Sequence, residues 1–138
     1  MLTITREVVL PHPRAAVWTA LTDPDALADW LMPNDFRAEL GHRFTLRTDP
    51  APGFDGVIRC EVLEVRAPER LAYSWVSGRV DTRVIWDLAG TEAGTRLLLR
   101  HEGFGVSQLP VRMLLGAGWK KLLGRKLPAY LAGRPVPA

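Results

Sequence analysis

His101 is the residue of this sequence whose type and position are best suited to chemistry. It alternates with Leu97 and Leu99, so in a strand the three side chains point to the same side. An inward imidazole could hold a ligand or act as a general base, because its pKa is easily tuned. In an enzyme, Tyr73 could assist it. Equally, His101 could be a hydrogen-bonded residue that fixes its strand against a neighbouring helix.

Motifs of known catalytic and cofactor sites are incomplete. The run 105–109 begins like the nucleophile elbow of hydrolases, but Leu109 stands where the second glycine is required. The run 116–121 lacks the third glycine of a dinucleotide-binding loop. The three histidines are isolated, and the single cysteine, Cys60, excludes an internal disulfide and a multi-cysteine metal site. The sequence therefore predicts no catalytic residue, no metal and no cofactor, with Cys60 in the core.

Aromatic and apolar side chains gather on what would be one face of a sheet. Trp75 and Trp86 each alternate with apolar residues, and such a face could stack a planar ligand or form a core. Leu115 and Trp119 would close over it from a C-terminal helix, and Met32 would lie in a flexible lip. The candidate cavity-lining residues are Trp30, Met32, Phe44, Leu46, Tyr73, Trp75, Trp86, Leu99, His101, Leu115 and Trp119.

The elements that would position these residues follow from two periodicities. Alternation predicts a first strand over 2–10, and apolar residues at helical spacing then predict two short helices, over 14–21 and, with Asp23 as its N-cap, over 24–30. Between Phe36 and Glu102 the period is two, which predicts a six-strand antiparallel meander. One of these strands, over 57–66, breaks its alternation at Val62 and Leu63, so a bulge is expected there.

Helical spacing returns in the last part of the chain. Ser107 is a plausible cap for a long helix, and Pro128 should kink that helix or end its regular part. Gly116, Gly118 and Gly124 each cost about 1 kcal/mol inside a helix, which suggests a close approach or a space kept open beneath it. The sequence thus predicts an α+β fold in which a curved seven-strand antiparallel sheet surrounds one long helix.

Charge is unevenly distributed along the chain. The 138 residues contain 18 Lys and Arg against 15 Asp and Glu, a formal charge of +3. Residues 1–102 sum to −3, whereas residues 103–138 carry +6 and no acid. The basic helix could be a solvated face, or a patch for an acidic protein, a membrane surface or nucleic acid. No nucleic-acid module is recognisable, so nucleic acid is not an expected partner.

No apolar run in the sequence is long enough for a membrane span, so none is expected. The N-terminal residues include a charged pair, Arg6 and Glu7, where a signal peptide would need an apolar stretch. These two observations lead us to expect a cytoplasmic location.

Four sequence segments together resemble one known superfamily. They are Pro13-x-x-x-Val17-Trp18-x-x-Leu21-Thr22-x-Pro24-x-x-Leu27-x-x-Trp30, Arg70-Leu71-x-Tyr73-Ser74-Trp75, Gly94-Thr95-x-Leu97-x-Leu99-x-His101-x-Gly103-Phe104 and Gly118-Trp119-x-x-Leu122. This combination, over residues 2–132, resembles the START-like or SRPBCC superfamily, in the branch named after the C-terminal domain of the heat-shock-protein-ninety ATPase activator. The resemblance implies a helix-grip fold with a hydrophobic pocket between the sheet and the last helix. It implies no single function, because relatives include lipid and hormone binders, polyketide cyclases and co-chaperone domains.

The leading expectation is a single domain over residues 1–138, with a loose tail at 133–138, that binds a small apolar or aromatic molecule without catalysis. The first alternative is a protein-interaction module of the chaperone-activator type that uses exposed sheet or the basic helix, where Lys120, Lys121 and Arg125 would contact the partner. The second alternative is a cyclase-type enzyme that uses His101 and Tyr73.

Overall fold

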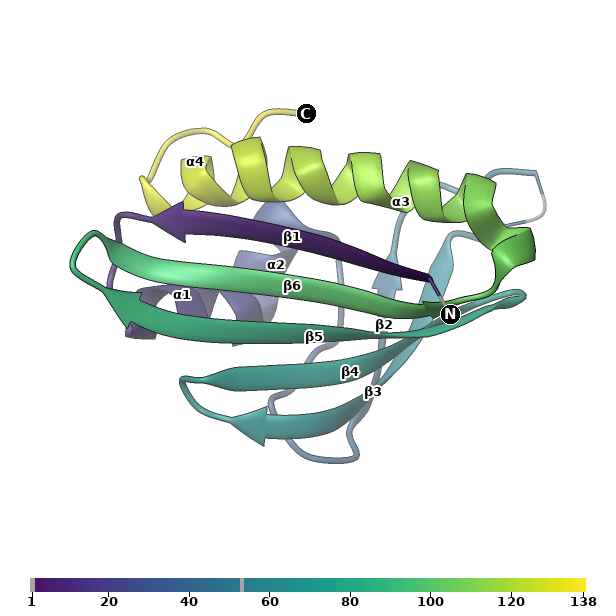
Figure 1. Cartoon of the computed structure of the whole chain (residues 1–138), viewed down its shortest axis with the longest axis horizontal. Coiled ribbons are helices and arrows are strands. Elements are labelled where there is room, and N and C mark those ends of the chain that lie inside the picture. The colour runs from purple at the N-terminus through teal and green to yellow at the C-terminus, as the bar shows by residue number, and fades with distance from the viewer. Residues whose placement is uncertain (1, 53) are drawn as a thin grey trace.

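Six antiparallel strands, two short helices and one long C-terminal helix form the structure (Figure 1). The computed structural model describes residues 2–52 and 54–138. In chain order the elements are β1 (Leu2–Leu10), α1 (Arg14–Thr22), α2 (Pro24–Trp30), β2 (Arg43–Arg47), β3 (Val57–Arg66), β4 (Arg70–Ser77), β5 (Val80–Thr91), β6 (Gly94–Phe104), η1 (Val106–Gln108), α3 (Leu109–Lys121), η2 (Leu122–Lys126) and α4 (Leu127–Leu131).

The sheet has the strand order β1-β6-β5-β4-β3-β2, with every neighbouring pair antiparallel. Short turns join β3, β4, β5 and β6 in sequence, a longer connection leads from β2 to β3, and β1 pairs with the other side of β6. The predicted bulge is confirmed, because the register between β3 and β4 shifts between Val62 and Glu64. The α+β architecture with one long C-terminal helix is also confirmed.

The predicted number of strands, seven, is wrong by one. Residues 35–42 form no strand, and only an isolated bridge joins Asn34 to Leu46 of β2. The segment before β2 occupies the outer edge of this strand instead: the Asp35 carboxylate accepts the Thr45 amide hydrogen at 2.6 Å, and the Pro33 carbonyl accepts the Arg47 amide hydrogen at 2.9 Å. A further strand has no free edge to join at this position, and Gly41, with a φ of 81°, turns the chain into β2.

The long helix is continuous from Leu109 to Leu131 (Figure 1). The capping role predicted for Ser107 is wrong, because Ser107 lies inside η1 and Gln108 is the residue that precedes α3. The Gln108 side chain accepts the Gly105 amide hydrogen at 2.9 Å. Near its end the helix widens into the π-type turn η2, where the Leu127 amide bonds to the Leu122 carbonyl. Pro128 follows this turn and has no amide hydrogen, so the regular α-helix is interrupted just before it, as expected.

The glycines of the helix do not share the role that the sequence suggested. A Cβ added at Gly116 would meet the Arg6 guanidinium at 3.2 Å, so here the close approach is real. A Cβ at Gly118 or Gly124 would meet nothing within 4 Å, because both face outward. Only Gly116 therefore fits the prediction.

The core lies between the inner face of the sheet and the helices (Figure 1). Strand alternation directs Leu71, Tyr73 and Trp75 of β4 inward, and all three are buried. The end of the long helix, η2 and α4, packs against α1, α2 and β1, whereas α3 contacts β1. Among the described residues, no helix combines the length and the apolarity that crossing a membrane requires.

Candidate functional site: the aromatic interior under the C-terminal helix

The structure brings most of the predicted cavity-lining residues together. Met32 and Leu115 are half-buried at the border of the core. The fully buried members of the set come from α2, four strands and α3: Trp30, Phe44, Leu46, Tyr73, Trp75, Trp86, Leu99, His101 and Trp119. The set is therefore one cluster in space, as the shared strand parity predicted.

Trp119 of α3 is the centre of this cluster. Its ring lies 5.5 Å from Trp75 and 5.5 Å from Trp86, measured between ring centroids, and 6.0 Å from His101. Trp86 in turn contacts Trp30 edge-to-face at 6.3 Å. Such edge-to-face and tilted pairs stabilise the core beyond the burial of area alone. Trp119 therefore inserts from the helix between the aromatic residues of the sheet.

Two phenylalanines that the sequence reasoning did not assign belong to the same interior. Phe36 contacts Phe44 at 4.9 Å and Tyr73 at 6.3 Å, and Phe104 contacts His101 at 4.8 Å. Phe36 lies in a segment without regular structure, so no periodicity points to its burial. Phe104 ends β6 and shares no parity with His101, but the left-handed Gly103 before it, with a φ of 108°, reverses the expected alternation. Gly103 was therefore the feature of the sequence that could have indicated the burial of Phe104.

His101 bridges the sheet and the long helix through both ring nitrogens. The Trp119 indole donates to Nδ1 at 3.0 Å, and because an indole can only donate, Nδ1 carries no proton. Nε2 therefore carries the proton and donates to the Thr82 hydroxyl at 2.7 Å. Thr82 donates in turn to the Trp75 carbonyl at 2.8 Å. These hydrogen bonds fix β6 against the long helix, which is the structural role that the sequence offered for His101 beside the ligand-binding or general-base role.

Burial keeps the His101 imidazole neutral. Removal of the ring from water lowers its pKa from the usual 6.5 to about 3, since no counter-charge compensates for the lost hydration. With both nitrogens occupied, His101 has no free position for a substrate while Trp119 is in place. The arrangement therefore holds the helix and leaves the ring a weak base near neutral pH.

Tyr73 is a further buried residue with a polar group, and its hydrogen bonding is incomplete. Its hydroxyl oxygen accepts the Trp86 indole hydrogen at 3.0 Å. Its own proton finds no acceptor within the part of the chain that the structure describes. Burial also raises the pKa of the Tyr73 phenol, so the proton stays on the oxygen. Tyr73 thus offers a hydrogen-bond donor inside an otherwise apolar space.

Cys60 is a core residue, as predicted. Its side chain is buried in β3, and burial together with the nearby Asp35 charge raises the pKa of the thiol to about 12. The thiolate, which is the reactive form, is therefore not populated at neutral pH.

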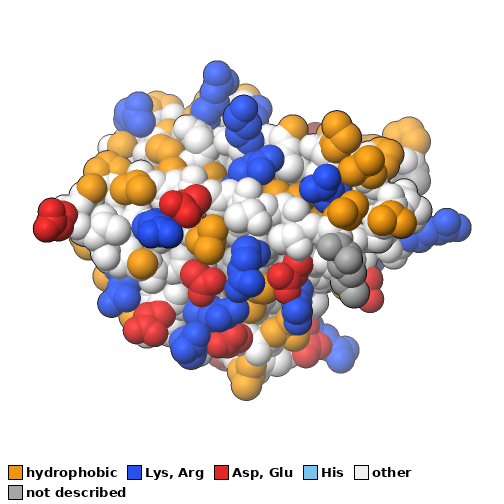
Figure 2. All heavy atoms as spheres, in the orientation of Figure 1, with side chains coloured by type: hydrophobic (Ala, Val, Ile, Leu, Met, Phe, Trp, Pro, Cys, Tyr) orange, Lys and Arg blue, Asp and Glu red, His pale blue; other side chains and the backbone are white. Residues whose placement is uncertain are grey.

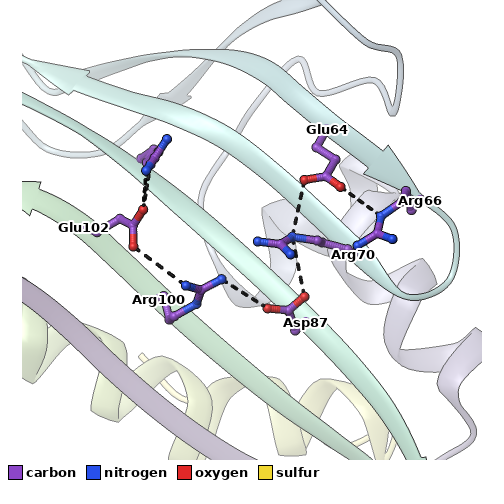
Figure 3. Close-up of polar contacts among 7 residues, drawn as sticks. Glu64, Arg66, Arg70, Asp87, Arg100 and Glu102 are labelled. Atoms are coloured by element: carbon purple, nitrogen blue, oxygen red, sulfur yellow. Dashed lines mark hydrogen bonds and ion pairs between the residues drawn. The ribbon is translucent and has the colours of Figure 1, made fainter.

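Open grooves of about 580, 490 and 260 Å³ lie on the outer face of the sheet. Acidic and arginine side chains alternate across four strands on this face (Figure 3). Glu64 contacts Arg66 at 2.8 Å, and Asp87 lies 3.6 Å from both Arg70 and Arg100. Each such surface pair contributes about 0–1 kcal/mol. The two signs neutralise one another, so the outer face has no strong charge of its own.

Solved structures resemble the whole chain. A protein from Mesorhizobium loti, MLL2253, is 32% identical, with a TM-score of 0.88 and 96% of this chain and 98% of that chain covered. BH1534 from Bacillus halodurans is 30% identical, with a TM-score of 0.73 and coverage of 88% and 91%. DynU16, a putative protein in the dynemicin biosynthetic locus, is 28% identical with a TM-score of 0.78; 96% of this chain covers 48% of that one.

No curated protein matches the sequence. A family model does match it, over residues 11–132, which is most of the chain and includes both short helices, β2 to β6 and the long helix. The resemblance first seen in separate sequence segments is therefore confirmed over the fold as a whole, and the chain belongs to the family of proteins like activator of Hsp90 ATPase homolog 1.

Proposed function

We propose that this protein binds a small planar apolar molecule between the inner face of the sheet and α3, in the position that the Trp119 side chain occupies. The observation that carries the proposal is the Tyr73 hydroxyl, which is buried in an aromatic interior with a proton that no described residue accepts. An unpaired buried donor costs about 1–3 kcal/mol, so a ligand that supplies an acceptor would gain from it.

His101 supports the same proposal from the other end of the cluster. Thr82 holds the ring in the form that carries its proton on Nε2, so Nδ1 is a fixed acceptor directed into the interior. A ligand that displaces Trp119 could donate to this nitrogen in place of the indole. The expected ligand is therefore a planar apolar molecule with one acceptor and one donor.

Entry of such a molecule requires movement of α3, and the first part of α3 is weakly held. Its polar links to the sheet are the Arg6 guanidinium to the Gly116 carbonyl at 3.2 Å and the Arg112 guanidinium to the Thr3 carbonyl at 3.4 Å. Of residues 109–115, none is fully buried. Displacing this part therefore exposes little additional apolar surface, but the ligand also requires Trp119, near the end of α3, to leave its buried position.

The comparison with DynU16 is in keeping with a small-molecule role. That protein is described as lying in the dynemicin biosynthetic locus, and it shares 28% of its aligned residues with this chain. Dynemicin itself is not implied as the ligand, because the ligand is defined here by the donor and acceptor of the interior.

Titration with a matched pair of aromatic probes tests the proposal. 2-Naphthol can both donate and accept a hydrogen bond, whereas naphthalene has the same rings and can do neither. In isothermal titration calorimetry, Tyr73→Phe should weaken 2-naphthol by about fivefold, the equivalent of one neutral hydrogen bond, and leave naphthalene unchanged. Tyr130→Phe is the matched control, because Tyr130 is the other tyrosine and lies half-buried in α4.

Two results would contradict the proposal. One is the absence of saturable binding of both probes to the unmodified protein. The other is an equal effect of Tyr73→Phe and Tyr130→Phe on 2-naphthol, which would mean that the Tyr73 hydroxyl does not contact the ligand.

A helper module for a protein partner is the second candidate, favoured by the family description, which names an Hsp90 ATPase activator homologue. Lys120, Lys121 and Arg125 are exposed on the helix and would meet an acidic surface of the partner. Stimulation of a purified Hsp90 ATPase that is lost when all three are changed to Glu would support this candidate. No stimulation by the unmodified protein would exclude it.

A further inference from the structure

The first part of the long helix presents its large apolar side chains to solvent. Met113 and Leu114 are 66% and 74% exposed, Val106 in η1 is 83% exposed, and Leu109 and Val111 are also exposed. We call these five residues the apolar tip. Figure 2 shows hydrophobic side chains gathered at the end of the molecule where α3 begins. Other exposed large apolar residues, such as Leu40 and Leu63, come from separate segments of the chain.

Cations follow the apolar tip along the same face of the helix. Lys121 and Arg125 are seven and eleven residues after Leu114, so helical periodicity places them on its outward side, and all three are exposed. Lys120 is exposed one position earlier. Residues 103–138 contain no Asp or Glu, so nothing within this segment neutralises these charges. The outward face is therefore apolar for about two turns and then cationic.

A further cation comes from the sheet. Arg79 is exposed on the turn between β4 and β5, and the Gln108 side chain donates to its carbonyl oxygen at 2.8 Å. The contact places this turn beside the start of α3. The turn beside the start of α3 therefore adds one exposed cationic residue, Arg79, to those of the helix.

We propose that this face of the molecule docks on an anionic lipid surface, with the apolar tip inserted among the lipids and Lys120, Lys121 and Arg125 at the headgroups. Exposed apolar residues beside unpaired cations are the pattern of helices that lie in a membrane interface. This surface is separate from the interior site proposed above, and it requires no ligand.

Two other occupants fit the face less well. A second copy of the chain, docked through the same face, would bring together two segments of +6 each. A protein partner would more commonly meet Trp, Tyr or Arg at the centre of the contact, and the apolar tip consists of Val, Leu and Met. An anionic bilayer matches both the charge and the aliphatic character.

Co-sedimentation with lipid vesicles tests the proposal on the full chain. The protein should bind vesicles of phosphatidylcholine that contain about a third phosphatidylglycerol. Its binding to vesicles of pure phosphatidylcholine should be weaker by about tenfold or more. Met113→Glu with Leu114→Glu, and separately Lys120→Glu with Lys121→Glu, should each reduce binding to the anionic vesicles by about tenfold or more. Circular dichroism of each variant confirms that the fold is retained.

Each pair of substitutions has a matched control elsewhere on the surface. Leu40→Glu with Leu63→Glu repeats the apolar-to-acidic change at exposed positions outside the helix. Arg37→Glu with Arg47→Glu repeats the charge reversal on and before β2. Both controls should bind anionic vesicles within about twofold of the unmodified protein, if the face and not the overall charge governs docking.

A label reports insertion directly. Cys60 is buried, so a bimane group will attach selectively to Met113→Cys, with Leu40→Cys as the control position. Bimane emission should shift to shorter wavelength on anionic vesicles at position 113 only. The proposal is overturned by equal binding to both vesicle types, by no binding, by a shift at both positions, or by a dimer in light scattering that Leu114→Glu dissociates.

Discussion

The two halves of the C-terminal helix differ in burial, and the more apolar first half is the one exposed to solvent. In residues 109–115, Leu, Val and Met side chains lie largely in solvent. In residues 116–131, Trp119, Leu123 and Leu127 are buried and the helix packs on the sheet, α1 and α2. The difference shows that the sheet and the short helices decide which half is buried, since hydrophobicity alone would bury both. The second half is an anchor, and the first half is available for movement or for contact.

Truncation of one large side chain in each half should give the largest contrast. Trp119→Ala removes three aromatic contacts and the indole hydrogen bond to His101, so the free energy of unfolding should fall by about 3–5 kcal/mol. Leu114→Ala removes an exposed side chain and should change it by about 0.5 kcal/mol or less. Urea unfolding of the two variants measures both values. Similar losses in the two would contradict the division of the helix.

Acid should weaken the anchor through His101. The pKa of His101 in the folded protein is lowered to about 3, against the usual 6.5 in the unfolded chain. Between these two pH values the unfolded chain binds a proton on this histidine and the folded chain does not. The stability that neutral His101 confers is complete above pH 6.5 and is lost as the pH falls towards 3. Between pH 7 and pH 4 the loss should be about 3 kcal/mol, since each pKa unit is worth about 1.4 kcal/mol.

The carboxyl groups also titrate in this range, so the contribution of His101 is measured as the difference between the unmodified protein and a variant without the histidine. His101→Phe keeps an aromatic ring but does not titrate, and its urea-unfolding free energy at the two pH values gives the contribution of all other groups. The unmodified protein should lose more stability than this variant. An equal loss in both proteins would show that His101 is protonated without cost, and that it does not hold the helix as described.

Alanine at the helical glycines should give the smallest effect. Gly118→Ala adds a Cβ that meets nothing, so the better helix propensity should stabilise the protein by about 0.5–1 kcal/mol. Gly116→Ala should gain less, because its Cβ would meet the Arg6 guanidinium at 3.2 Å where that group reaches the Gly116 carbonyl. Thermal unfolding resolves differences of this size. A larger gain at Gly116 would show that Arg6 does not constrain the helix there.

Much of the fold could be predicted from periodicity. The first strand, both short helices, the β3 bulge and the inward parity of Tyr73 and Trp75 were all visible as apolar spacing. These features depend on neighbours along one element, so a single sequence contains the information.

The features that sequence reasoning missed depend on contacts between distant segments. The predicted seventh strand is absent from residues 35–42, and the Asp35 side chain and the Pro33 carbonyl bond to the edge of β2 instead. Phe36 is buried without belonging to any regular element, and the apolar stripe of the helix continues beyond the region that the sheet covers. For the candidate site, residue identity predicted the cluster, but the orientation of the His101 and Tyr73 hydrogen bonds required coordinates.

The Asp35 contact has a consequence for the behaviour of the protein at high concentration. An uncovered edge strand can recruit a strand of another molecule and begin ordered aggregation. At β2 the Asp35 carboxylate accepts the Thr45 amide hydrogen, and this bond lowers the pKa of the carboxyl, so the charged acceptor persists into mild acid. At the opposite margin, β1 lies beside α3, where Arg112 reaches the Thr3 carbonyl. Both edge strands are therefore protected against pairing with a strand of another molecule, β2 by the Asp35 carboxylate and β1 by α3.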